Sequence, residues 1–128
     1  MNLLLDLHIF LWMILESHRL PPTIAKILND NNNHRYLSMV SVWELQIKVT
    51  TGKLTLPDSV AEFVTTYRTI NNITPLAISE NHIWTVGNLP LHHRDPFDRL
   101  LIAQAIHEGF TLVTADALFN TYPVKLLP

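Results

Sequence analysis

The sequence predicts an α/β domain of three layers, in which helices cover both faces of a short, mostly parallel central sheet. Short apolar segments alternate along the chain with segments of helical periodicity. The short segments are apolar throughout, as strands buried on both faces are, and do not alternate between apolar and polar residues. A length of 128 residues fits one hydrophobic core, since single domains typically span about 100 to 150 residues. We therefore expect residues 1–128 to form a single domain.

Local patterns place the elements of the first half of the chain. A continuous apolar run predicts a strand at the N-terminus, and apolar residues at helical spacing predict the helices. Ser41 and Glu44 form a capping box S-x-x-E, which predicts the start of one helix, and Ser59 with Glu62 predicts the start of the next. In order, we expect a strand at 2–5, helices at 9–14 and 22–30, a loop at 30–34, a strand at 36–39, and helices at 42–50 and 60–70.

The second half of the chain contains one strongly marked helix. Asp95 followed by Pro96 is a good helix start, because Asp accepts from the first amides and proline loses no hydrogen bond at the first helical position. Residues 97–108 are apolar almost all round, so this helix is expected to be buried, and Gly109 ends it. The remaining expected elements are a strand at 73–78 that Pro75 interrupts, a short helix from Ser79, and strands at 110–114 and 124–127.

Composition excludes several classes of function. The chain has no cysteine, which excludes disulfide scaffolds, thiolate zinc sites, iron–sulfur clusters and cysteine nucleophiles. Its net charge of −2 provides no global positive field, so any nucleic acid must be bound locally. No glycine-rich phosphate loop is present, and the apolar stretch 9–15 is far shorter than the roughly 20 residues of a membrane span. We expect a cytoplasmic protein without a membrane anchor.

Four acidic residues follow or precede the expected strands at one edge of the sheet. Asp6 ends the first strand, Glu44 lies in the helix after the second, and Asp116 follows the strand that ends at Thr114. Asp98 lies in the first turn of the buried helix. Each acid alone is explained by helix capping. Together they would repel one another unless a cation compensated, and oxygen ligands of this kind suit Mg²⁺ or Mn²⁺ in phosphodiester hydrolysis.

Four strings of the chain resemble the PIN domains of the VapC-type toxin group. They are LLLDLHIFLW, SVWEL, LHHRDPFDRLLIAQA and LVTAD, and they span nearly the whole sequence. The resemblance implies an α/β/α sandwich and a ribonuclease that holds Mg²⁺ or Mn²⁺ through Asp6, Glu44, Asp98 and Asp116. It also implies a toxin of a type II toxin–antitoxin pair, with an antitoxin protein and a second copy of the chain as partners. Leu7 stands where the family commonly has Thr, which puts the fine geometry in doubt.

Several nearby residues are weaker candidates for the same site. Asp95 is read as a helix cap, and Thr114 as a residue that contacts the metal ligands. Lys48, Arg94 and Arg99 are candidate contacts to RNA phosphates, although surface cations more often serve only as solvated residues or ion-pair partners.

The tryptophans and the apolar side chains of the first helices suggest contacts of another kind. Trp12, Trp43 and Trp84 would suit base stacking, but their apolar helical surroundings favour packing in the core or an interface. Exposed apolar residues on the first helices would suit an antitoxin helix or a second protomer.

Two other functions remain open from the sequence. One is a PIN-like module that binds RNA or protein without cleaving, to which the departure at Leu7 gives slight support. The other is a receiver-type or phosphatase domain with Asp6 as phosphoacceptor, which leaves Glu44 and Asp98 unexplained.

Overall fold

The central sheet is parallel and has four strands in the order β3-β2-β1-β4. The structure, a computed structural model, describes residues 1–92 and 95–127. Leu5, at the end of β1, pairs with Leu37 and Val113, so the strands end at the same edge of the sheet. The strands are β1 (Asn2–Leu5), β2 (His34–Ser38), β3 (Ile73–Leu76) and β4 (Thr111–Val113).

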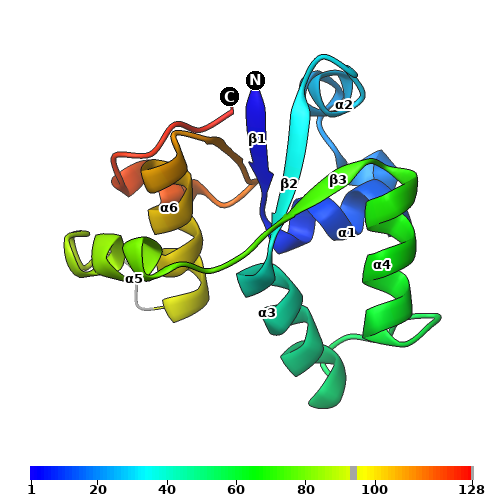
Figure 1. The fold of residues 1–128 in the computed structure, drawn as a ribbon. Coiled ribbons are helices and arrows are strands. Elements are labelled where there is room, and N and C mark those ends of the chain that lie inside the picture. The colour runs from blue at the N-terminus through cyan, green and yellow to red at the C-terminus, as the bar shows by residue number, and fades with distance from the viewer. Residues whose placement is uncertain (93–94, 128) are drawn as a thin grey trace.

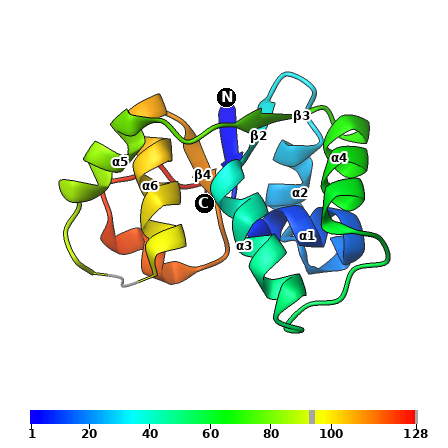
Figure 2. The ribbon, with the colours of Figure 1, turned by 60° about the horizontal axis from the view of Figure 1, so that its bottom comes forward.

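Helices cover both faces of this sheet, which confirms the expected three-layer α/β/α fold. Figure 1 shows α5 and α6 on one side and α1, α2 and α4 on the other, with α3 below the strand ends. Figure 2 brings that lower end forward, where α1, α3 and α6 surround it. The helices are α1 (Leu7–Leu15), α2 (Pro22–Leu28), α3 (Met39–Thr50), α4 (Val60–Ile70), α5 (Glu80–Gly87) and α6 (Pro96–Glu108), with short 3₁₀ turns η1 (Ser17–Arg19) and η2 (Ala117–Thr121). None of the helices in the described residues is long and apolar enough to cross a membrane.

Strand β1 joins two hydrophobic cores, one on each face of the sheet. Leu3 and Leu5 belong to the core that contains Phe10 and Phe63, whereas Leu4 belongs to the core that contains Phe119. Successive side chains of a strand point to opposite faces, so a central strand needs apolar residues at every position. This is why the first strand is a continuous apolar run.

Helix α3 starts earlier than the sequence analysis predicts. Ser38 is its N-cap and accepts a hydrogen bond from the amide of Val40 at 3.0 Å. Ser41 is buried inside the first turn, so the predicted capping box with Glu44 is wrong. The side chain of Ser38 already satisfies an amide at the strand end, and the chain therefore turns from β2 into α3 without a linker.

The strand predicted at 124–127 does not form. Leu126 makes only an isolated bridge to Leu112, although backbone bonds from Leu112 to Lys125 (2.8 Å) and from Leu127 to Leu112 (3.0 Å) hold the segment in place. A hydrogen bond from the amide of Val124 to the carbonyl of Tyr122, 2.8 Å long, closes a bend where the predicted strand would begin. The strand predicted at 73–78 is shorter, and it lies at the sheet edge, where Pro75 can be accommodated without an amide to donate.

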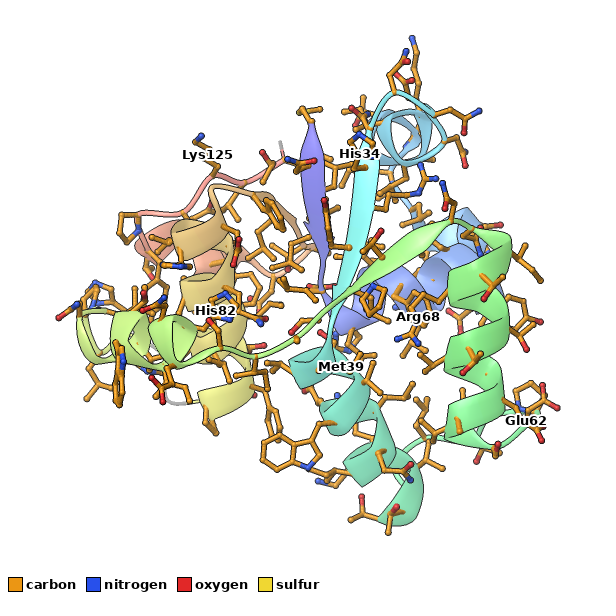
Figure 3. All side chains as sticks on the ribbon, viewed as in Figure 1. His34, Met39, Glu62, Arg68, His82 and Lys125 are labelled. Atoms are coloured by element: carbon orange, nitrogen blue, oxygen red, sulfur yellow. The ribbon has the colours of Figure 1, made fainter. Side chains whose placement is uncertain are left out.

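A buried polar network fixes β2, α5 and α6 relative to one another. The hydroxyl of Ser38 donates to Oε1 of Gln104, and both side chains are fully buried. The Gln104 amide donates to the carbonyl of Ala77 and lies 3.3 Å from Nδ1 of His82. His82, labelled between α5 and α6 in Figure 3, places Nε2 2.9 Å from Glu108. Since α3 starts at Ser38, this network also sets α3 against α6.

We expect Gln104→Leu to lower the free energy of unfolding by about 1–3 kcal/mol, because buried groups of Ser38 and Ala77 lose their partner. Urea unfolding measures the change. Gln46→Leu is the control, since the exposed Gln46 amide bonds only to Thr50, and it should change stability by no more than about 0.5 kcal/mol. Equal effects of the two variants would contradict a structural role for the network.

Candidate functional site

A pocket of about 140 Å³ lies at the carboxyl ends of β1, β2 and β4. Its walls come from α1, α3, α6 and the turn after β4. In parallel sheets this edge is where ligands bind. Five carboxylate side chains line the pocket: Asp6, Glu44, Asp95, Asp98 and Asp116. The structure therefore brings together the four acids singled out from the sequence, and Asp95 with them.

Asp6 is the most buried of these acids, with 7% of its surface exposed. As the N-cap of α1, it accepts from the amide of Ile9 at 2.8 Å through Oδ1. The Thr114 hydroxyl donates to Oδ2 at 2.5 Å. Burial raises the pKa of Asp6; the bond from Thr114 and the bond from Ile9 lower it, and the charge of Asp116 raises it further.

Thr114 links the acid of β1 to the acid after β4. Its hydroxyl oxygen donates to Asp6 and also accepts from the amide of Asp116 at 3.0 Å. Asp116 is exposed and caps η2 by accepting from the amide of Leu118 at 2.9 Å. The T-x-D sequence thus forms a small turn that holds Asp6 in one orientation.

Glu44 faces the pocket from α3 and is half-buried. Burial raises the pKa of Glu44, and the charges of Asp98 and Asp95 raise it further, whereas Lys48 lowers it. The Lys48 ammonium lies 3.7 Å from Glu44 and lines the same pocket. Lys48 is thus the candidate RNA contact that the structure places at the acids.

Asp95 and Asp98 both lie at the start of α6. Asp95 accepts from the amides of Phe97 and Asp98, at 2.8 and 3.2 Å, through one oxygen. This is the cap expected from the sequence, and it leaves the second oxygen of Asp95 outside these two bonds. Asp98 is half-buried and lines the pocket from the first turn of the helix.

Arg99, a second candidate cation, lies away from the acids. Arg99 is not among the residues that line the acidic pocket. Its guanidinium donates to the carbonyls of Pro90 and Val86, at 2.8 and 3.3 Å, and to the Tyr122 hydroxyl at 3.2 Å. Arg94 lies outside the described residues. Arg99 therefore joins α5 to α6 in this structure.

His8 is a residue of the pocket that the sequence analysis did not single out. It is exposed on the first turn of α1, lines the pocket, and its charge lowers the pKa of both Asp6 and Glu44. No motif marks this position. The one feature of the sequence that could have indicated His8 is its position two residues after Asp6, at the start of a helix.

A model of the PIN domain family matches residues 3–125 of the chain. The protein belongs to the PIN domain family. PIN domains are generally nucleases.

Solved structures share the fold of this PIN domain. One is the VapBC2 complex of Rickettsia felis bound to a DNA fragment from its promoter, with a TM-score of 0.78, 21% identity, and coverage of 99% of this chain and 98% of the other. VapBC-1 of nontypeable Haemophilus influenzae has a TM-score of 0.66 and 15% identity, with 99% and 97% coverage. FitAcB of Neisseria gonorrhoeae has a TM-score of 0.59 and 20% identity, with 98% and 96% coverage. No curated protein sequence matches the chain significantly.

The donor set of this PIN domain fits a hard divalent cation. The carboxylates supply only oxygen ligands, and besides burial, the charge of Asp116 raises the pKa of Asp6 and the charges of Asp98 and Asp95 raise the pKa of Glu44. Within residues 1–92 and 95–127, no three acidic or histidine side chains are already positioned around one point. The acids therefore share a pocket without being gathered around one point, so side chains other than the fixed Asp6 must rotate for them to share an ion.

The raised pKa values make the stability of the metal-free protein depend on pH. The folded state holds protons on Asp6 and Glu44 more tightly than the unfolded chain, whose ordinary values are 3.8 and 4.5. The stabilisation from these protons is complete below about pH 4 and is lost as pH rises through the raised pKa values.

We expect the unfolding temperature with a chelator to fall as pH rises from the ordinary pKa values of Asp6 and Glu44 to 7.5, and Mn²⁺ at pH 7.5 to restore it. Glu44→Gln should reduce the fall, because it removes one of the two titrating groups. Glu62→Gln, on α4 and outside the pocket (Figure 3), should leave the fall unchanged. If both variants show the wild-type fall, the raised pKa of Glu44 does not contribute to it.

Proposed function

We propose that this PIN domain is a divalent-metal-dependent endoribonuclease and the toxin of a type II toxin–antitoxin pair. The observation that carries the proposal is the pocket lined by acids that follow β1, lie on α3, lie at the start of α6 and follow β4. Helix capping explains each acid alone, but capping does not require acids, and it gives no reason for placing five of them around one cavity.

In the proposed enzyme, Asp6, Glu44, Asp98 and Asp116 hold Mg²⁺ or Mn²⁺. Such an ion supplies an activated water and neutralises charge on the scissile phosphate. Thr114 keeps Asp6 oriented through its 2.5 Å hydrogen bond, and Asp95 holds the first turn of α6 so that Asp98 faces the pocket. Lys48 places a positive charge at the same cavity, which favours binding of an RNA phosphate.

An apolar groove beside the acidic pocket supports an antitoxin as partner. Leu11, Trp12 and Leu15 of α1 line it together with Leu54, and its volume is about 290 Å³. His8 and Lys48 line both the groove and the acidic pocket. A partner helix with an apolar face would fill the groove and block access to the acids at the same time. The similar structures include complexes named VapBC and FitAcB, which agrees with a paired protein for this chain.

A second copy of the chain is the other proposed protein partner. Ile83 and Leu91 are 50% and 77% exposed, and with Val86, Pro96 and Leu100 they line an apolar groove between α5 and α6. Burial of such a surface stabilises association. The proposed protein acts in the cytoplasm, where RNA and an antitoxin would be available.

Asp98→Asn tests the nuclease directly. With purified protein, Mg²⁺ or Mn²⁺ and a mixed pool of cellular RNAs, we expect cleavage that a chelator abolishes and that the variant slows by about 100-fold or more, since even residues outside the ligand set cost 10- to 100-fold. Asp58→Asn, an exposed acid outside the pocket, is the matched control. If folded wild type cleaves no RNA in the pool, the non-cleaving binding module becomes the better account.

Thr114→Val tests how Asp6 is tuned. The hydroxyl lowers the pKa of Asp6, so its loss should raise that pKa and move the acidic limb of the pH–rate profile to higher pH. Thr114→Ser keeps the hydroxyl and should restore the wild-type profile. An unchanged profile in Thr114→Val would show that ionisation of Asp6 does not limit the rate.

A further inference from the structure

Two of the three tryptophans do not pack in the core. Trp43 and Trp84 are 57% and 63% exposed, whereas Trp12 packs against the core of α1 and α4. A large exposed aromatic side chain is costly to leave in water and is typical of a binding surface. Of the core or interface packing favoured for these residues from the sequence, packing in the core is therefore wrong for Trp43 and Trp84, and packing at an interface stays a prediction.

Trp43 differs from Trp84 in its position at the acidic pocket. It precedes Glu44 on α3, and its ring contacts Phe97, which precedes Asp98 on α6. The ring centroids are 4.9 Å apart, in an edge-to-face arrangement with an interplanar angle of 70°. Phe97 is itself part of the pocket wall. The aromatic pair thus continues the wall of the pocket outward to solvent.

This arrangement holds the indole in place before any ligand arrives. The edge-to-face contact restricts the side-chain rotation of Trp43, while more than half of its surface stays exposed. A pre-oriented aromatic ring loses little conformational entropy on binding. Bases of single-stranded nucleic acid stack on such rings without regard to sequence, because every base has a π-face.

We propose that Trp43, held by Phe97, is a stacking platform for a base of single-stranded RNA next to the phosphate in the acidic pocket. The inference rests on the proposed nuclease function and adds how its substrate is held. Lys48 is the one Lys or Arg among the described residues of the pocket wall, so the attraction that this wall offers the RNA backbone comes from a single positive charge. Stacking provides affinity that the pocket acids do not oppose. It also selects unpaired RNA, because a base within a duplex does not offer its face.

A protein interface is the competing explanation of this surface. Ile47 lies one turn after Trp43 on α3 and is 38% exposed, so the two form a small apolar patch. A protein partner would bury both side chains, whereas a stacked base needs the aromatic ring alone. Substitutions at the two positions therefore separate the two explanations.

Binding is measured with Mg²⁺ in the Asp98→Asn variant, because that substitution is expected to slow cleavage. The ligands are oligouridylate and an abasic ribose–phosphate oligomer of the same length. We expect Trp43→Ala to raise the Kd for oligouridylate about tenfold and to leave the Kd for the abasic oligomer unchanged. Trp43→Phe should retain part of the affinity. Trp84→Ala and Ile47→Ala, the matched controls, should bind within about twofold of the parent.

The proposal would be overturned if Trp43→Ala bound oligouridylate as tightly as its parent. It would also be overturned if Trp43→Ala lost as much affinity for the abasic oligomer as for oligouridylate. So would dissociation of a dimer by Trp43→Ala and Ile47→Ala alike in sedimentation, since that would assign the patch to a protein interface. Cleavage by wild type is scored separately. If wild type cleaves RNA and Trp43→Ala binds normally, only this inference fails; if base-dependent binding is lost but wild type cleaves nothing, the platform stands and the nuclease proposal fails.

Discussion

The candidate site depends on the fold holding several acidic side chains in one pocket at the edge of a buried sheet. Parallel strands must end at one edge, and the chain places Asp6 there with 7% of its surface exposed. Burial and the neighbouring acids raise the pKa of Asp6 and of Glu44. A domain of marginal stability tolerates such a site only if the rest of the fold fixes it firmly. The hydrogen bond from Thr114 does so locally, and the network of Ser38, Gln104 and His82 does so between layers.

The same edge brings unlike surfaces together. The acidic pocket shares His8 and Lys48 with the apolar groove of α1, and it shares Phe97 with the exposed ring of Trp43. A ligand on any of these surfaces lies beside the acids. This continuity is the physical basis of the proposal that RNA binds in the pocket and that a protein in the groove blocks access to it.

The fold and the acids were predictable because they follow from patterns along the chain. Apolar runs that end in Asp6 or precede Asp116 mark strand ends, and parallel topology brings those ends together. The start of α3 was not predictable, because Ser38 and Ser41 are both good caps and tertiary packing decides between them. The exposure of Trp43 and the place of His8 depend on how α3 and α1 rotate against α6, which no local pattern records. The strand at 124–127 was predicted from its apolar residues, but the chain bends at Tyr122–Val124 and then makes one isolated bridge, at Leu126.

The central claim is that these acids form one divalent cation site, and diffraction from crystals soaked in Mn²⁺ tests it most directly. We expect an anomalous peak among Asp6, Glu44, Asp98 and Asp116, with the side chains of Glu44, Asp98 and Asp116 rotated toward it and with the peak missing in Asp98→Asn crystals. Crystals that show no peak at this pocket, with the four acids still apart, would contradict the account and leave the acids as helix caps.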